Sequence, residues 1–174
     1  MKLDTALTHP NETIAHAAAA YCIAIKHLIK NHNKLDRAQA AFMAAEGSTT
    51  DKDVQDWFVA AKQLLESKAV HEGRFLSLDD YNPQQRMSYV KHAFILSFYS
   101  LLRAESMEED QVCDHVMRQC AILAGDTDTN CAIAGGLVGA YVGAYNLPRS
   151  KVKKVLECDT SLGREADRLD LFQP

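Results

Sequence analysis

Residues 123–145, "LAGDTDTNCAIAGGLVGAYVGAY", place two aspartates ahead of a long segment of small and apolar residues that carries no charge. A glycine in a helix interior costs up to about 1 kcal/mol relative to alanine. This segment contains Gly135, Gly136, Gly139 and Gly143, so it can be helical only if contacts with other elements support it. Three of these glycines share one stripe with Ala132, on which a neighbouring backbone could approach closely. We therefore predict a central helix that other helices surround.

The rest of the chain also has helical periodicity, because apolar residues recur at three- and four-residue spacing. We predict three helices over about 8–30, with Thr8 as its cap, 36–45 and 51–68. A fourth helix follows Pro83, and a fifth starts at a capping box of Ser106 and Glu109. A sixth helix starts at the aspartate turn, and a seventh covers about 150–157. No segment alternates with period two for long enough to form a strand. The expected fold is an all-α, orthogonal multi-helix bundle of about seven helices. Residues 1–174 are expected to form a single domain, with a polar tail at about 158–174.

Composition excludes several classes of function. The formal net charge of −4 argues against nucleic-acid binding, which requires basic patches. The uncharged segment after the aspartates is shorter than the roughly 20 residues of a membrane span, so no membrane association is expected. The N-terminal residues lack the apolar core of a signal peptide. The five cysteines are odd in number and form no CxxC pair, which favours free thiols in a reducing compartment and a cytoplasmic location.

The two aspartates, Asp126 and Asp128, allow two interpretations. Either carboxylate could cap the helix that follows, where unpaired backbone N–H groups and the helix dipole favour negative charge. Together with the neighbouring threonines and asparagine, they also form a dense cluster of oxygen ligands of the kind that Mg²⁺ prefers. An EF-hand loop is excluded because Cys131 and Leu137 occupy the positions of its glycine and glutamate. A DxDx[TV] phosphatase is excluded because the fifth residue is Asn130 and the preceding segment is helical.

Three segments together resemble a known family. "GDTDTNCAIAGGLVGAYVGAYNLP" is similar to the C-terminal motif of the ADP-ribosylglycohydrolases, the group that includes dinitrogenase-reductase-activating glycohydrolase. "VKHAFILSFYSLLRAES" is similar to the segment that leads into this motif. "ALTHPNETIAHAAAAYCIAI" resembles a family stretch in which a Thr-His pair opens a long alanine-rich helix.

The resemblance implies a function and a set of site residues. Asp126, Asp128 and Thr129 would be ligands of Mg²⁺ (or Mn²⁺), with Asp128 bridging two ions, and His9 would lie near bound ADP-ribose. The family hydrolyses the glycosidic bond that joins ADP-ribose to a modified group, a reaction in which the ions stabilise developing negative charge. A carboxylate base from elsewhere would activate the water. Without the resemblance, His9 would be read as a surface or capping histidine.

The resemblance also indicates what is missing. Segments like the family's "GDAxG" and "TDDT" do not occur in the sequence, so the chain resembles only the C-terminal half of the family fold. The binuclear site would therefore be incomplete, and we expect the lone chain to be inactive. A second copy or a separate N-terminal-half chain would be its partner, meeting apolar surface at Leu137, Tyr141, Phe94 and Phe98. The alternative is a non-catalytic helical binding or structural module derived from the same family.

Overall fold

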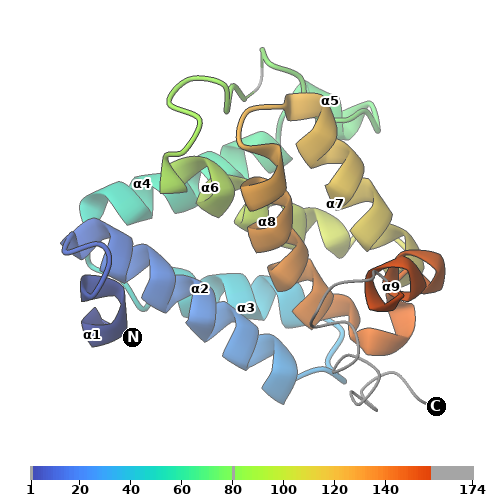
Figure 1. Cartoon of the computed structure of the whole chain (residues 1–174), viewed down its shortest axis with the longest axis horizontal. Helices are drawn as coiled ribbons and strands as arrows, with labels where there is room; N and C mark the ends of the chain where they lie inside the picture. The colour runs from blue at the N-terminus through green and yellow to red at the C-terminus, as the bar shows by residue number, and fades with distance from the viewer. Residues whose placement is uncertain (1, 80, 158–174) are drawn as a thin grey trace.

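The computed structural model describes residues 2–79 and 81–157, which form helices joined by turns and loops (Figure 1). The helices are α1 (Lys2–Ala6), α2 (Glu12–Lys30), α3 (Arg37–Glu46), α4 (Lys52–Leu65), α5 (Lys68–His71), α6 (Val90–Ala104), α7 (Glu109–Leu123), α8 (Thr127–Val142), the 3₁₀ turn η1 (Ala144–Asn146) and α9 (Arg149–Leu156). No strand occurs in these residues, so the prediction of an all-α bundle is confirmed. The polar tail expected at about 158–174 lies outside the described residues.

The expected helices are all present, but two of the predicted helix starts are wrong. Asn11 rather than Thr8 caps α2, and its side chain accepts a hydrogen bond from the Ile14 N–H at 3.2 Å. The capping box of Ser106 and Glu109 does not form, because the Ser106 hydroxyl turns back to donate to the Arg103 carbonyl oxygen. In both cases a hydrogen bond between residues three positions apart decides where the helix starts or which group the hydroxyl meets.

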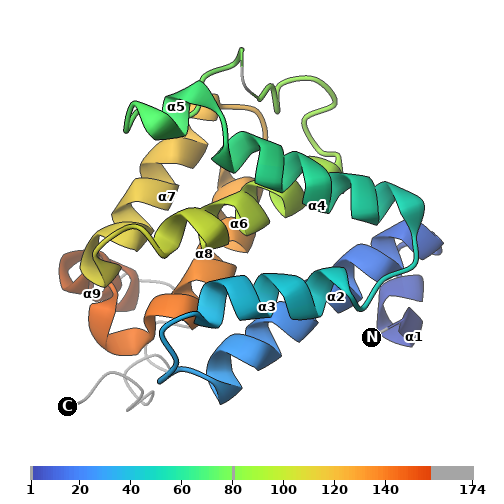
Figure 2. The same cartoon turned by 180° about the vertical axis from the view of Figure 1, so that it is seen from behind.

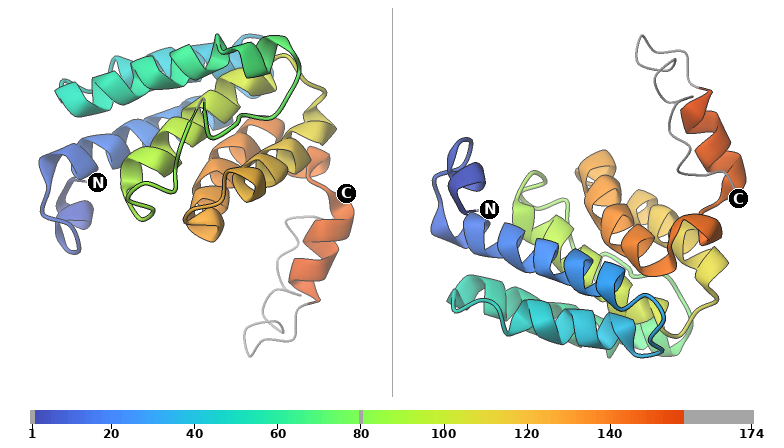
Figure 3. Two further views of the ribbon diagram at one scale, coloured as in Figure 1. Left: turned by 90° about the horizontal axis from the view of Figure 1, so that it is seen from above. Right: turned by 90° about the horizontal axis from the view of Figure 1, so that it is seen from below.

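The central helix of the bundle is α6, whereas the sequence had suggested the glycine-rich helix α8. Twelve of the fifteen residues of α6 are buried. Seen from above, α6 lies between α4 on one side and α7 and α8 on the other (Figure 3, left). From behind, α4 passes in front of the first part of α6 (Figure 2). Because α6 is enclosed, it carries apolar residues around nearly its whole circumference.

An aromatic cluster joins α3, α4 and α6. The Phe58 ring meets the Phe98 ring at 4.7 Å and the Phe42 ring at 5.1 Å between centroids, both edge to face. Phe94 contacts Phe58 in the same way at 5.0 Å. Edge-to-face pairs add to the stabilisation from burial, so this cluster anchors α4 and α3 onto α6.

The four side chains expected to meet a partner protein are instead part of this closed core. Phe98 and Leu137 are 0% exposed, Phe94 is 3% exposed and Tyr141 is 7% exposed. The prediction that they form an open apolar patch is therefore wrong. The described helices bury these side chains among themselves.

One face of α8 remains exposed, and this face includes part of the predicted glycine stripe. Ala134, Leu137 and Val138 are fully buried, whereas Ala132 and Gly136 are exposed. An added Cβ at Gly139 or Gly143 would meet no atom within 4 Å, and at Gly136 it would meet only the hydroxyl of Tyr21, at 2.8 Å. Within residues 2–79 and 81–157, no backbone atom lies within 4 Å of an added Cβ at these three glycines, so the predicted close approach of a neighbouring backbone is not seen there.

Candidate functional site

The aspartates lie just after a sharp turn between α7 and α8. Ala124 has φ 56° and ψ −146°, and Gly125 has φ 76°, so two successive residues adopt positive φ. A Cβ on Gly125 would come within 2.8 Å of the Pro83 carbonyl oxygen. The absence of a side chain at Gly125 therefore lets the loop before α6 pack directly on the turn, and this contact fixes where α8 begins.

The two carboxylates at the start of α8 have different roles in the local structure. Asp126 is the N-cap residue, but its side chain makes no capping hydrogen bond. The Thr129 N–H, the neighbouring Asp126 side chain and the backbone N–H of Asp128 hold the pKa of Asp128 below its usual value. The Asp128 carboxylate thus interacts with the first N–H groups of α8. The Asp126 carboxyl lies beside it without a capping function.

The donor set at this turn is chemically suited to a hard divalent cation. Asp126 is half-buried, while Asp128 and Thr129 are exposed, so water reaches two carboxylates and a hydroxyl that are close together in the sequence. Within residues 2–79 and 81–157, no three His, Cys, Asp or Glu side chains gather in a way that could hold a metal ion. The oxygen ligands fit Mg²⁺ or Mn²⁺, and they fit as part of a site that needs further ligands.

His9 lies apart from the aspartates. It belongs to the exposed turn between α1 and α2, where its Nδ1 is 3.0 Å from the Thr8 hydroxyl and its N–H donates to the Thr5 carbonyl oxygen. Figures 1 and 3 show this turn and the start of α8 at separate places, with the start of α6 between them in the view from below. The structure thus brings Asp126, Asp128 and Thr129 together, and His9 is not among them.

Two contacts that the sequence analysis did not identify hold α8 in place. The Tyr21 hydroxyl on α2 donates to the Ile133 carbonyl oxygen at 2.7 Å, and burial raises the pKa of Tyr21 to about 12. Near the other end of α8, the Arg37 guanidinium on α3 donates to the Tyr141 carbonyl oxygen at 3.3 Å. A tyrosine on an alanine-rich helix and a lone arginine give no sequence signal for such pairing, because their partners are more than 100 residues away.

A mostly apolar groove adjoins the aspartate turn. It has a volume of about 610 Å³ and lies between α7, α8 and α9. Asp128 stands on its border with Cys131 and Gly135, and Met117 and Val152 line it from the other helices. Its one lysine, Lys151, is already bound to the Asp114 carboxylate at 2.6 Å. The groove therefore offers apolar contact rather than charge to whatever meets the turn.

Comparison with known proteins places these features in a family. A family model described as ADP-ribosylglycohydrolase matches residues 1–173. No curated protein and no solved structure matches the chain. Among the described helices, none has the combination of length and hydropathy that crossing a membrane would require.

Proposed function

The chain belongs to the ADP-ribosylglycohydrolase family, and from this premise we propose that it takes part in Mg²⁺-dependent hydrolysis of the glycosidic bond of ADP-ribosylated substrates. The observation that carries the proposal is the pair of adjacent carboxylates at the start of α8. Asp128 has a lowered pKa and is therefore ionised at neutral pH, and Asp126 is not used for capping. Helix capping alone accounts for Asp128 but leaves the placement of Asp126 unexplained.

Asp126, Asp128 and Thr129 would hold the Mg²⁺ or Mn²⁺ ion. When bound, the ion supplies positive charge that stabilises negative charge developing during hydrolysis. The start of α8 adds its own unpaired N–H groups and positive dipole end, which favour an anionic ligand at the same position. Because Asp128 is fully exposed, the ligand would reach these groups directly from solvent.

His9 would contact a different part of the ligand. ADP-ribose is an extended molecule, so its ends can touch separate places on a protein. The His9 imidazole is exposed at the α1–α2 turn and is available to donate to a phosphate or a ribose hydroxyl. We therefore propose His9 as a substrate-binding residue and not as a metal ligand.

The proposal includes a partner that completes the site. Hydrolysis requires a general base within hydrogen-bonding distance of the attacking water, and no third acidic side chain joins Asp126 and Asp128 in the described residues. We propose that a separate N-terminal-half chain, or a second copy, brings the remaining ligands and the base. Its docking cannot rely on Phe94, Phe98, Leu137 or Tyr141, which are buried. The open face of α8 beside the turn is the surface that such a partner would cover.

A titration tests the metal site directly. Isothermal titration calorimetry with Mg²⁺ and with Mn²⁺ should show weak binding to the chain, and Asp128→Asn should abolish it. Asp56→Asn, an exposed aspartate on α4, is the matched control and should bind as the original chain does. Equal heats for the original chain and for Asp128→Asn would mean that the turn only caps α8.

An activity assay tests the need for a partner. The purified chain alone should release no ADP-ribose from an ADP-ribosylated protein. Turnover should appear when the N-terminal half of a family member is added, and it should be lost in Asp126→Ala. If the lone chain is active and Asp126→Ala abolishes that activity, the partner is unnecessary. Metal binding without turnover in any combination would favour the second candidate, a non-catalytic binding module.

A further inference from the structure

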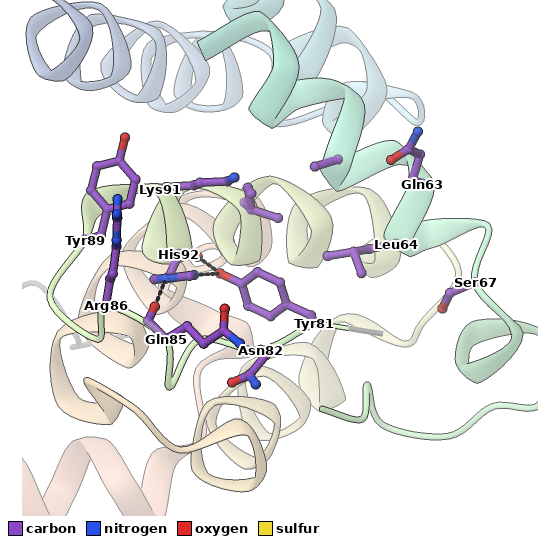
Figure 4. A pocket seen from close by; sticks show the side chains of 12 residues that line it. Gln63, Leu64, Ser67, Tyr81, Asn82, Gln85, Arg86, Tyr89, Lys91 and His92 are labelled. Atoms are coloured by element: carbon purple, nitrogen blue, oxygen red, sulfur yellow. Dashed lines mark hydrogen bonds between the residues drawn. The ribbon is translucent and has the colours of Figure 1, made fainter. Parts of the chain in front are cut away.

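The groove between α7, α8 and α9 differs in character from a second cavity, of about 570 Å³, between α4 and the start of α6. In the second cavity the Tyr81 hydroxyl lies 3.1 Å from the His92 Nδ1, so these two polar groups are paired with each other (Figure 4). The groove, of about 610 Å³, is lined mainly by apolar side chains instead. Apolar grooves between helices are surfaces on which amphipathic helices bind.

Helix α9, which forms one wall of the groove, is packed incompletely on the rest of its own chain. None of its residues is buried, and Val155 is 73% exposed. In both views of Figure 3, α9 projects from the edge of the bundle. The ion pair of Lys151 and Asp114, at 2.6 Å, joins α9 to α7, but the two side chains are 40% and 43% exposed. Ion pairs as exposed as this contribute little, so α9 is held only weakly.

The groove is open between two apolar surfaces. One is the apolar face of α9, where Val152, Val155 and Leu156 follow the spacing of a single helix face. The other is formed by Met117 of α7 and Ala132 of α8, both of which are exposed. Because water reaches both surfaces, a further apolar surface that entered the groove would be stabilised by burial.

The charges around the groove indicate which surface would enter it. Cys113 and Met117 line the groove from α7, and Asp110 and Asp114 lie on the same face of that helix by their spacing. Asp128 stands at another edge. Neither Asp110 nor Asp128 forms an ion pair within the part of the chain that the structure describes. Helix α9 contains four cations and no acidic residue beside its apolar face, so an α9 helix matches the groove in both charge and polarity.

We propose that the chain forms a two-fold dimer in which α9 of each copy lies in the groove of the other. The apolar face of α9 packs on Met117 and Ala132 of the other copy, and its cations meet Asp110 and Asp114 there. The exposed ion pair that α9 makes in its own chain is re-formed between the copies, so little is lost on exchange. Exchange of an identical element closes a symmetric dimer, because the same groove is filled twice. A second copy thus becomes the partner that covers the open face of α8, and in this respect the dimer rests on the proposed function.

Analytical ultracentrifugation over about 1–200 μM chain measures the self-association. The chain should form a dimer and no larger species, because the exchange fills both grooves. Val155→Asp places a charge in each apolar groove and should raise the Kd of the dimer at least about tenfold. Since Val155 is 73% exposed in the single chain, this variant should keep its fold, which the melting temperature shows. Val59→Asp, at a 47% exposed valine of α4 outside the groove, is the matched control and should dimerise as the original chain does.

A charge-reversing pair of variants tests the match between α9 and the acidic edges of the groove. Lys153→Glu/Lys154→Glu should weaken the dimer at least about tenfold, because like charges then face each other across the interface. Lys26→Glu/Lys30→Glu changes the net charge by the same amount at two exposed lysines of α2 and should leave the dimer intact.

Isotope-filtered nuclear magnetic resonance on a mixture of ¹³C-labelled and unlabelled chain shows which surfaces meet. Contacts between copies should join the methyl groups of Val155 to those of Met117 and Ala132. The dimer is ruled out if the chain stays monomeric over the whole concentration range, or if Val155→Asp associates as the original chain does. Contacts between copies at another surface, or contacts of the groove with residues 158–174 of the same chain, would equally rule it out.

Titration with Mg²⁺ separates this result from the test of the metal site, because Val155→Asp leaves Asp126, Asp128 and Thr129 unchanged. A chain that binds Mg²⁺ but remains monomeric contradicts the dimer alone. A dimer with the expected contacts that binds no Mg²⁺ supports the exchange of α9 and contradicts the metal site alone.

Discussion

The guanidinium of Arg37 lies over the ring of Tyr141, with its central carbon 4.3 Å from the ring centroid. The same guanidinium pairs with the Glu109 carboxylate, and Glu109 in turn accepts a hydrogen bond from the Asn146 amide at 2.6 Å. This network joins α3, the start of α7 and the end of α8. It fixes the end of α8 that lies opposite the aspartate turn, so the direction of the helix depends on it.

Removal of Arg37 should destabilise the chain strongly. Arg37→Ala deletes the cation–π contact and removes the Arg37 donor from the Tyr141 carbonyl oxygen and from the Glu109 carboxylate, which keeps only the Asn146 amide. We expect a loss of about 3 kcal/mol in the free energy of unfolding, measured by urea denaturation. Lys68→Ala breaks the exposed pair with Glu72 and is the control, with an expected loss below about 0.5 kcal/mol. Similar values for the two variants would show that the network contributes little.

Two neighbouring glycines of α8 should respond differently to alanine. Gly139→Ala meets no atom within 4 Å and should stabilise the chain by about 1 kcal/mol through helix propensity. Gly136→Ala places a Cβ 2.8 Å from the Tyr21 hydroxyl, and the loss of its hydrogen bond to Ile133 should offset the gain by about 1 kcal/mol.

The role of Tyr21 in this difference is testable by a double-mutant cycle. In a Tyr21→Phe background the obstructing hydroxyl is absent, so Gly136→Ala should now stabilise as Gly139→Ala does. The expected coupling between positions 21 and 136 is about 1 kcal/mol in thermal or urea unfolding. If Gly136→Ala behaves identically in both backgrounds, the hydroxyl is not what limits this position.

Two substitutions at neighbouring residues of the turn before the aspartates should change the stability of the chain in opposite directions. Ala124 has φ 56° and ψ −146°, a conformation that favours glycine, so Ala124→Gly should stabilise the chain by about 1 kcal/mol after the entropic cost of glycine. Gly125→Ala adds a Cβ 2.8 Å from the Pro83 carbonyl oxygen at φ 76° and should destabilise by about 3 kcal/mol. Gly73→Ala, at φ 68° in open space, is the control, with an expected loss of about 1 kcal/mol.

Stability should fall on acidification because His92 is buried and His115 is half-buried. Burial lowers the pKa of His92; the hydrogen bond to the Gln85 carbonyl opposes this shift and the Lys91 charge adds to it. Burial, together with the Arg103 charge, lowers the pKa of His115. A pKa that is lower in the folded state means that the unfolded chain binds the proton more tightly. The stabilisation is therefore complete above the ordinary value of 6.5 and is lost as the pH falls toward the folded-state values.

His115→Phe should reduce this dependence on pH. The imidazole stacks on Phe75 with centroids 4.9 Å apart, and its buried Nε2 has no hydrogen-bond partner among the described residues, so a phenyl ring can replace it. We expect unchanged or higher stability at about pH 7.5 and a smaller loss at about pH 5 in urea denaturation. An equal loss in the original chain and in the variant would assign the pH dependence to other groups.

The sequence by itself determined the helices and the aspartate pair. Apolar spacing located the long helices, because a buried stripe recurs with the helical period whatever it packs against. Asp126, Asp128 and Thr129 come together because they are neighbours at the start of one helix. The family was recognisable from the segments around them, and the family match over residues 1–173 confirms it.

Only the tertiary structure decided which helix is central, what each glycine faces and where the second cavity lies. Glycine in α8 suggested close backbone packing, yet the enclosed helix is α6, which carries apolar residues around nearly its whole circumference. Arg37 meets Tyr141, and Arg86 shares a cavity with Leu64, across long stretches of chain. The local sequence does not indicate such contacts, because each residue type can contact many different partners. Only the fold determines which partner it meets.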